Sequence, residues 1–350
     1  MKQIILILFF TAVHSFCMAQ SEKAKKLVDE GIVLHDKGDY ENALKKYEEA
    51  IAEDPAYIDP VYEKGLTLYT MKKYDESIEL SKKIIKDFPG DPLLKDVYVQ
   101  YGSALDDLGK PKDALKIYNE GLKKFPGYFL LHFNKGITYS IMNDMDKAYS
   151  SYQDALISKP LHASSYFRVG VLLKNRNHIP AMMACMMHLV LEPYTERAAA
   201  SFKNLQELIY ANVEKTGDNN ITITMSPDML DTKKSKKEPD NFRMQEMMFT
   251  LSSALDKDSV LGTVAKTPIE KFDLKLQLLI SSLHEKEKGF FSERYVPFFK
   301  AVKANNYTMI VSRLVFANTS DEANAAWLKV NTEKIDAFYD WLKEYNWPDK

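Results

Sequence analysis

Residues 31–55 read GIVLHDKGDYENALKKYEEAIAEDP, and the order of residue types in this stretch returns further along the chain. A glycine is followed by a small residue, a tyrosine, a second small residue and a proline, which here are Gly31, Ala43, Tyr47, Ala50 and Pro55. The same order with the same spacing starts again at Gly102 and at Gly136. Self-similarity at a fixed period indicates a repeat architecture, in which each unit buries its apolar face against its neighbours.

Two further copies are degenerate. The copy that starts at Gly65 has Ser81 in place of the tyrosine, and the copy that starts at Gly170 runs one residue short. Repeat glycines are 34 residues apart, except that Gly102 follows Gly65 by 37 residues. The extra residues fall around 89–92, which contain two prolines and a glycine, so we expect a surface loop there.

The residue types at these positions have a steric reason. A glycine where two helices cross lets their backbones approach closely, and the tyrosine fills the space toward the next repeat. Proline then ends the second helix of each copy. Turn segments at 37–39, 108–110 and 143–145 separate the two helices. The sequence therefore predicts an all-α fold built from antiparallel helix pairs.

This pattern resembles the tetratricopeptide repeat, a helix pair with a period of about 34 residues. The resemblance covers residues 24–193 and implies a superhelix of five repeats. Residues 195–210 read as a capping helix, which a terminal repeat needs. We therefore expect a tetratricopeptide-repeat domain over residues 20–210.

In proteins with this repeat, the first helix of each pair lines a concave groove that holds a protein or peptide. The resemblance assigns that role to residues next to the repeat glycines, which are Val28, Ile32, Tyr62, Leu66, Phe133, Asn134, Ile137, Phe167, Arg168 and Val171. Most of these side chains are apolar, so a partner or the chain's own C-terminal helices should cover them. Asp29, Asp59, Glu63 and Asp96 make one end of the groove acidic, and Arg168 makes the other end more basic, which would orient a bound segment.

The N-terminal residues 1–19 have the pattern of a secretory signal peptide. One lysine precedes an apolar run of about ten residues and a small-residue end, which is too short for a membrane-spanning helix. We expect cleavage after Ala19 and a periplasmic or secreted protein. Lipidation at Cys17 is the weaker alternative because Phe16 stands where a small residue is needed. No other segment is long and apolar enough to cross a membrane, so no integral membrane segment should remain.

The remainder of the chain divides into a polar linker over 211–241 and a C-terminal helical domain over 242–350. The linker contains a lysine-rich run at 232–237 and a strand-like stretch at 221–224 without an evident partner strand. The C-terminal region includes the helix start Thr267-Pro268-Ile269-Glu270, which has the form of a capping box. This region resembles no family that we recognise.

Composition and motifs give no sign of catalysis. The chain has 47 basic and 49 acidic side chains, a balance that argues against a nucleic-acid partner. After removal of the leader Cys185 is the single cysteine, so no internal disulfide can form. His284-Glu285 has Lys288 where a zinc motif requires a second histidine. We expect no cofactor, no metal site and no enzymatic activity.

We expect a scaffold or adaptor of the bacterial cell envelope, and several alternatives stand beside this interpretation. The C-terminal region could hold an active site built from carboxylates such as Glu285, Glu293 and Asp336, with the repeats recruiting the substrate. The apolar groove could instead join copies of the chain, and the sequence does not determine the oligomeric state. Two clusters could bind ligands but are more often core packing: the methionines, cysteine and histidine of 182–188, and the aromatic residues of 290–299.

Overall fold

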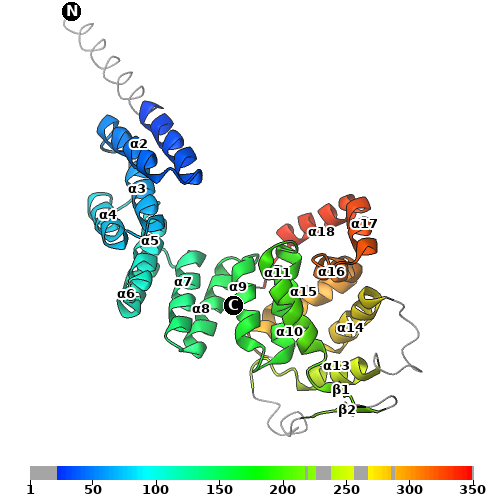
Figure 1. Ribbon diagram of the computed structural model, residues 1–350. Helices are drawn as coiled ribbons and strands as arrows, with labels where there is room; N and C mark the ends of the chain where they lie inside the picture. Colours follow the sequence, from blue (N-terminus) through cyan, green and yellow to red (C-terminus); the bar gives the residue numbers. More distant parts are fainter. Residues whose placement is uncertain (1–21, 217–219, 226–237, 256–266, 285–287, 349–350) are drawn as a thin grey trace, which may run out of the picture. The chain divides into compact units, whose positions relative to one another are not determined.

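The computed structural model describes residues 22–216, 220–225, 238–255, 267–284 and 288–348, and most of them are helical (Figure 1). Contacts divide the chain into two compact units, residues 1–151 and residues 152–350. The predicted leader, the lysine-rich run at 232–237 and Glu285 lie outside the described residues. None of the described helices is long and apolar enough to span a bilayer.

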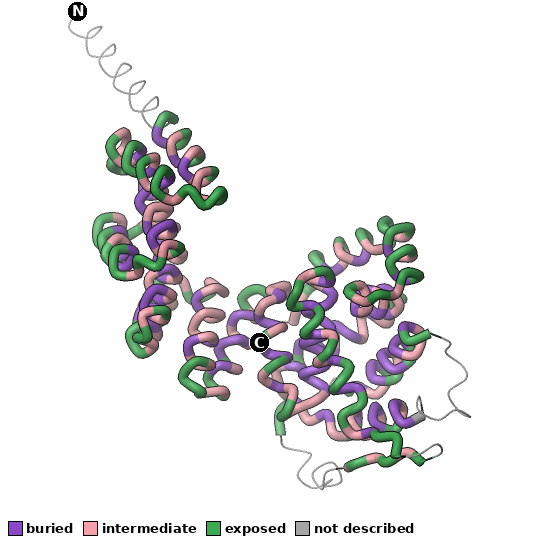
Figure 2. The backbone as a smooth tube through the Cα atoms, in the orientation of Figure 1, coloured by how far each residue is buried: buried purple, intermediate pink, exposed green. Residues whose placement is uncertain are grey.

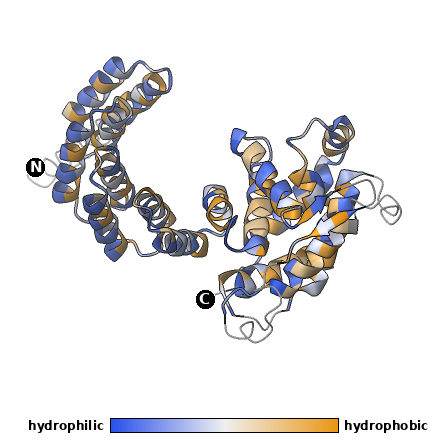
Figure 3. Cartoon of the chain, turned by 60° about the horizontal axis from the view of Figure 1, so that its bottom comes forward, coloured by the Kyte–Doolittle hydropathy of each residue, from blue (hydrophilic) through white to orange (hydrophobic). Residues whose placement is uncertain are grey.

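In the first unit, antiparallel helices follow one another and pack mainly on their neighbours in sequence. These helices carry hydrophobic and hydrophilic sides, as Figure 3 shows beside the N-terminus. A helix over residues 22–36 is followed by α2 (Tyr40–Glu53), α3 (Asp59–Thr70), α4 (Tyr74–Asp87), α5 (Leu94–Asp107), α6 (Pro111–Lys124), α7 (Phe129–Ile141) and α8 (Met145–Ser158), which extends past the unit boundary. The predicted all-α repeat fold is confirmed, and residues 89–92 form the connection between α4 and α5.

Tyrosine rings occupy the space that the repeat glycines leave open. A Cβ atom built on Gly31 would lie 2.5 Å from the ring of Tyr47, and one built on Gly102 would lie 2.2 Å from the ring of Tyr118. Both tyrosines are fully buried. In the degenerate second copy, the Ser77 hydroxyl instead donates a hydrogen bond to the Gly65 carbonyl at 2.8 Å. The repeat glycine therefore makes room for the tyrosine ring of its own copy, whereas the sequence analysis expected it to make room for a neighbouring backbone.

The turn inside each helix pair uses one left-handed residue. These residues are Gly38, Lys72, Gly109 and Asn143, with φ angles of 79°, 61°, 72° and 61°. Glycine adopts this conformation without steric cost and asparagine tolerates it, whereas lysine is strained there. The recurrence at Lys72 shows that the helix packing, and not the local residue type, imposes the turn.

The second unit combines the last repeats with the C-terminal helices. Its elements are α9 (Ala163–Leu173), α10 (His178–Leu191), α11 (Glu196–Ile209), β1 (Val213–Lys215), β2 (Ile221–Ile223), α13 (Arg243–Leu255), α14 (Pro268–Ser282), α15 (Phe290–Ala304), α16 (Thr308–Val315), α17 (Glu322–Val330) and α18 (Thr332–Glu344). The predicted boundaries at 210 and 241 both lie inside this compact unit, and the contacts place the division at 151/152 instead.

Helix α10 forms the centre of the second unit. Every residue from Ile179 to Val190 is buried, and Figure 2 shows the helix as a nearly continuous buried segment. It contacts α9, α11, α13 and α16. A helix that is hydrophobic all round belongs in a core. The methionines and Cys185 therefore fill the interior, as the packing interpretation of the 182–188 cluster requires.

Two long-range hydrogen bonds join the last repeats to the C-terminal helices. The hydroxyls of Tyr166 and Tyr295 lie 2.9 Å apart, and their rings pack edge to face. The Tyr339 hydroxyl donates to the Val190 carbonyl at 2.8 Å. Tyr295 belongs to the aromatic group of 290–299, whose members Phe291, Tyr295, Phe298 and Phe299 are almost fully buried. These rings are core and not a platform for a ligand.

Part of the predicted linker is folded. Strands β1 and β2 pair antiparallel, with Val213 opposite Ile223, and the hairpin packs on α13. Asp240 is buried, and its carboxylate accepts a hydrogen bond from the Ser292 backbone at 2.7 Å. Because these residues are held by tertiary contacts, they belong to the second unit and not to a mobile linker. The predicted capping box at Thr267 is present, with both reciprocal hydrogen bonds.

Candidate functional site

The predicted groove residues of the first unit have different degrees of exposure. Val28 is 4% exposed and packs in a core cluster with Tyr47, so its assignment as a groove residue needs correction. The other predicted groove residues of this unit are half-buried, and they are Ile32, Tyr62, Leu66, Phe133, Asn134 and Ile137. The Asn134 amide donates to the Leu130 carbonyl of its own helix at 2.8 Å. The first helices therefore offer only parts of these side chains to a partner.

Three predicted groove residues belong to the second unit. Phe167 is half-buried, and its ring lies 5.3 Å from the ring of His188. The Arg197 guanidinium also lies over the Phe167 ring, at 5.8 Å from its centre. Arg168 is exposed, and Val171 is 50% exposed. Phe167 is thus held by two side chains of its own unit.

Carboxylates gather on the first helices of the first unit. They are Asp29, Asp36, Asp59, Glu63, Asp96, Asp106 and Asp107, and we call this set the acidic row. The helix over residues 22–36 carries two of them, α3 two and α5 three. Asp29, Asp59 and Glu63 all raise the pKa of Tyr57, and Asp96 and Glu63 both raise that of Tyr62, so neighbouring members of the row lie close together. The acidic end predicted from Asp29, Asp59, Glu63 and Asp96 therefore extends further along the unit.

Tyrosine hydroxyls hold three members of the acidic row in place. The Tyr57 hydroxyl donates to the Asp59 carboxylate at 2.8 Å. The Tyr128 hydroxyl donates to Asp96 from the connection before α7. On the neighbouring helix, the Tyr69 hydroxyl donates to Asp107. A tyrosine hydroxyl satisfies one acceptor site of a carboxylate, and an ionised carboxylate has about four such sites.

Asp106 connects three helices of the first unit. Its carboxylate accepts hydrogen bonds from Thr138 on α7 at 2.6 Å and from Tyr118 on α6 at 3.1 Å. Its other oxygen is buried without a partner among the described residues. Burial raises the pKa of Asp106, the two hydrogen bonds lower it, and the neighbouring Asp107 raises it further. Negative charge at this position is therefore costly to the folded protein.

Glu63 is a member of the acidic row on which the charges of other members act. Burial raises the pKa of Glu63, and the charges of Asp59 and Asp36 raise it further. Lysines of the first unit form ion pairs elsewhere, for example Lys46 with Glu30 and Lys64 with Glu48. Among the described residues, no lysine or arginine forms an ion pair with a member of the acidic row.

Gln100 adds an unpaired amide between two first helices. It lies on α5, one turn after Asp96, and is 6% exposed. Its amide packs over Gly65 on α3, where an added Cβ would lie 3.1 Å from the amide nitrogen. Neither amide atom has a hydrogen-bond partner among the described residues. A buried amide in this state costs free energy in the folded chain.

The tyrosines were missed by the sequence analysis. Tyr57 and Tyr128 both stand two residues after a repeat proline, at Pro55 and Pro126, so their shared position was a usable signal. Tyr69 had no such signal, because its partner Asp107 lies 38 residues away on another helix. Hydrogen bonds of this kind depend on how neighbouring repeats stack.

The structure describes two of the candidate catalytic carboxylates of the C-terminal region, Glu293 and Asp336. Glu293 accepts a hydrogen bond from the Gly289 backbone at the start of α15. Asp336 is exposed on α18. Among the described residues, no group of three or more histidine, cysteine or acidic side chains could hold a metal ion.

Comparison with known proteins concerns the repeats. Residues 31–72 match a family model described as TPR repeat. No curated protein matches the sequence. TTC0263, a thermophilic TPR protein of Thermus thermophilus, is 20% identical, with a TM-score of 0.45 over 52% of this chain and 99% of that one.

Two other solved structures show similarly limited likeness. YrrB, described as a TPR protein with an unusual peptide-binding site, is 21% identical, with a TM-score of 0.38 over 54% of this chain and 97% of its own. Pseudomonas aeruginosa pilF is 15% identical, with a TM-score of 0.43 over 55% of this chain and 91% of its own. On the family-model match over residues 31–72, the repeat order of residues and the helix pairs described above, the chain contains tetratricopeptide repeats.

Proposed function

We propose that this protein is an exported scaffold whose acidic row binds an extended, lysine- or arginine-rich segment of another protein. Tetratricopeptide-repeat proteins in general bind proteins or peptides. The observation that carries the finer proposal is the acidic row itself: seven carboxylates on adjacent helices, without an ion pair to any described lysine or arginine.

The chemistry of the row suits a cationic side chain. A guanidinium or ammonium group that reaches Glu63 would supply the counter-charge that the folded chain lacks there. Tyr57 and Tyr128 already orient the carboxylates of Asp59 and Asp96, so a cation would meet acceptors that need little rearrangement. The faces of tyrosine rings also attract cations. An uncharged or acidic segment would gain none of these interactions.

Export would place the partner outside the cytoplasm. The pattern of residues 1–19 supports a cleaved signal peptide and a periplasmic location. We therefore look for the partner among proteins of the bacterial cell envelope. Cell fractionation with antibody detection tests this part, and recovery of the full-length precursor in the cytoplasm would contradict it.

Binding is tested with an array of extended hexapeptides of varied composition, probed with the chain from residue 20 to residue 350. We expect enrichment of lysine- and arginine-containing peptides. The double variant Glu63→Gln and Asp96→Asn should weaken their binding by about tenfold or more, because each charge-assisted contact contributes about 1.5–3 kcal/mol.

A matched control removes two carboxylates from second helices. Glu41 on α2 and Glu79 on α4 are both exposed on the second helices of their pairs, and Glu41→Gln with Glu79→Gln gives the same change in net charge. This control should bind basic peptides nearly as well as the unmodified protein. Equal losses in the two double variants, or a preference for acidic peptides, would exclude the acidic row as the binding surface.

A further inference from the structure

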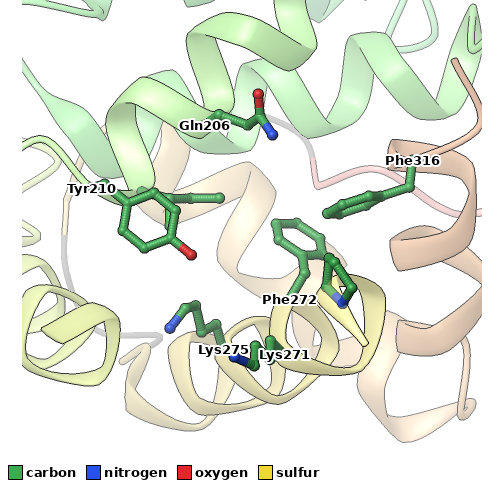
Figure 4. A pocket seen from close by; sticks show the side chains of 8 residues that line it. Gln206, Tyr210, Lys271, Phe272, Lys275 and Phe316 are labelled. Carbon is green, nitrogen blue, oxygen red and sulfur yellow. The ribbon is translucent and has the colours of Figure 1, made fainter. Parts of the chain in front are cut away.

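A cavity of about 340 Å³ lies inside the second unit, between α11 and α14, and Figure 4 shows the side chains around it. Its volume falls in the range of pockets that hold small molecules. The residues around it come from α11, from α14 and from Phe316 at the end of α16. The cavity contains no member of the acidic row, so it is a separate feature of the chain.

One wall of the cavity is apolar and fixed by ring packing. Phe316 lies with its ring 5.6 Å from that of Phe272 and 5.0 Å from that of Phe202, in both cases edge to face. Phe272 is buried. Ile209 adds an aliphatic side chain from α11. This wall can receive a flat or aliphatic apolar body without moving core residues.

The opposite wall carries two lysines one helical turn apart. Lys275 is 5% exposed, and its ammonium group donates to the Ser252 carbonyl at 3.0 Å. Lys271 is half-buried on the same side of α14. Lys271 follows the first turn of α14, and Lys275 lies in the middle of that helix. The described residues that line the cavity include these two lysines and no carboxylate.

Neutral polar groups complete the rim. Figure 4 shows the Tyr210 hydroxyl directed into the space, on the side of Lys275, with Gln206 across the opening. Tyr210 is 38% exposed, so the cavity is reached from solvent at this side. The nearby Glu207 is already paired with Lys174, and no carboxylate of the described residues forms an ion pair with Lys271. The cavity therefore joins a positive side to an apolar side.

We propose that this cavity binds a small anionic ligand that carries a carboxylate on an aromatic or aliphatic body. The carboxylate would lie between Lys271 and Tyr210, close to Lys275, and the apolar body would lie against Phe272 and Phe316. A cationic ligand would meet two like charges, and a ligand without an apolar part would leave the aromatic wall in contact with water. Both of those ligand classes are therefore disfavoured.

The test uses naphthoate as the probe and naphthalenemethanol as its neutral counterpart, titrated calorimetrically into the chain from residue 20 to residue 350. We expect saturable binding of naphthoate at one site and at least tenfold weaker binding of the neutral compound. Lys271→Met should weaken naphthoate binding by about tenfold, since a hydrogen bond to a charged group contributes about 1.5–3 kcal/mol. It should leave the neutral compound unchanged.

Two further variants separate the site from general effects. Lys203→Met removes an exposed lysine on α11 outside the cavity and should not change binding. Gln206→Trp places a large side chain at the exposed rim and should weaken both compounds. Absence of saturable naphthoate binding, equal affinity for the neutral compound, or equal losses in Lys203→Met and Lys271→Met would overturn the proposal. Because naphthoate is an anion, these outcomes do not depend on the acidic row.

Discussion

Replacement of Gly102 by alanine should destabilise the first unit far more than its size suggests. The new Cβ would lie 2.2, 2.5 and 2.7 Å from three ring carbons of Tyr118. Carbon atoms prefer separations of about 3.5–4.0 Å, so the ring would have to retreat by roughly 1 Å or more. Tyr118 is fully buried and its hydroxyl donates to Asp106, so there is no free space for that movement.

The magnitude follows from three contributions. Overpacking of a well-packed core costs about 1–3 kcal/mol. Displacement of the Tyr118 hydroxyl from Asp106 adds about 1 kcal/mol for the lost hydrogen bond. Alanine in a helix interior recovers roughly 0.5–1 kcal/mol relative to glycine. We therefore expect a net loss of about 1–3 kcal/mol in the free energy of unfolding.

The assay is urea unfolding of the chain from residue 20 to residue 350, combined with hydrogen exchange of peptides from α5 and α6. Gly90→Ala is the matched control, because no atom lies within 4 Å of a Cβ built there. Gly90→Ala should change stability by less than about 0.5 kcal/mol. In a Tyr118→Leu background, Gly102→Ala should cost less because the smaller side chain leaves room. Equal exchange protection in Gly102→Ala, Gly90→Ala and the unmodified protein would refute the steric account of the repeat.

Three further predictions concern single side chains. Glu63→Gln should stabilise the first unit near pH 7 and have no effect well below pH 4.5. The reason is that the pKa of Glu63 is raised in the folded state, so its ionised carboxylate destabilises the fold as the pH rises. Urea unfolding at pH 7 and well below pH 4.5 tests this. Burial lowers the pKa of His188 from 6.5 to about 4; the charge of Glu192 opposes this shift and that of Arg197 adds to it. The free energy of unfolding of the second unit should therefore fall by up to about 3 kcal/mol as the pH is lowered from 6.5 to 4. In thermal melts at several pH values, His188→Gln should remove most of this pH dependence of stability. An unchanged pH dependence would contradict the role of His188. Tyr166→Phe leaves the Tyr295 hydroxyl without its partner, so α9 and α15 should lose exchange protection together, by about 1–3 kcal/mol; loss in one helix alone would contradict the coupling.

The repeats could be predicted from sequence because their cause is local and periodic. A glycine and a tyrosine 16 residues apart, as in Gly31 and Tyr47, lie in one helix pair and meet through one turn. The capping box at Thr267 is similarly local, since its two hydrogen bonds span three residues. Interactions of this kind leave a pattern that a single sequence shows.

Features that arise from stacking distant segments could not be predicted in this way. A valine such as Val28 can line an apolar groove or lie in a core, so its residue type does not distinguish the two. Its packing in a core cluster with Tyr47 does distinguish them. Strand β1 is three residues long with one buried side chain, which is too short for a periodic signal. The cavity between α11 and α14 combines residues from 206 to 316, and the sequence gives no indication that these segments meet. Composition suggested a linker at Asp240, but its tertiary hydrogen bonds place it in the second unit.

The long-range hydrogen bonds of the second unit bear on the order in which the chain folds. The partners Tyr166 and Tyr295 are separated by 129 residues, and Val190 and Tyr339 by 149. Contacts of such high sequence separation slow folding, because a long loop must close before they form. Helices of the first unit pack on their sequence neighbours, so they can fold while the rest of the chain is still being synthesised. Until the C-terminal helices arrive, the apolar side of α10 that contacts α13 and α16 remains uncovered, and a chain truncated before α15 should aggregate.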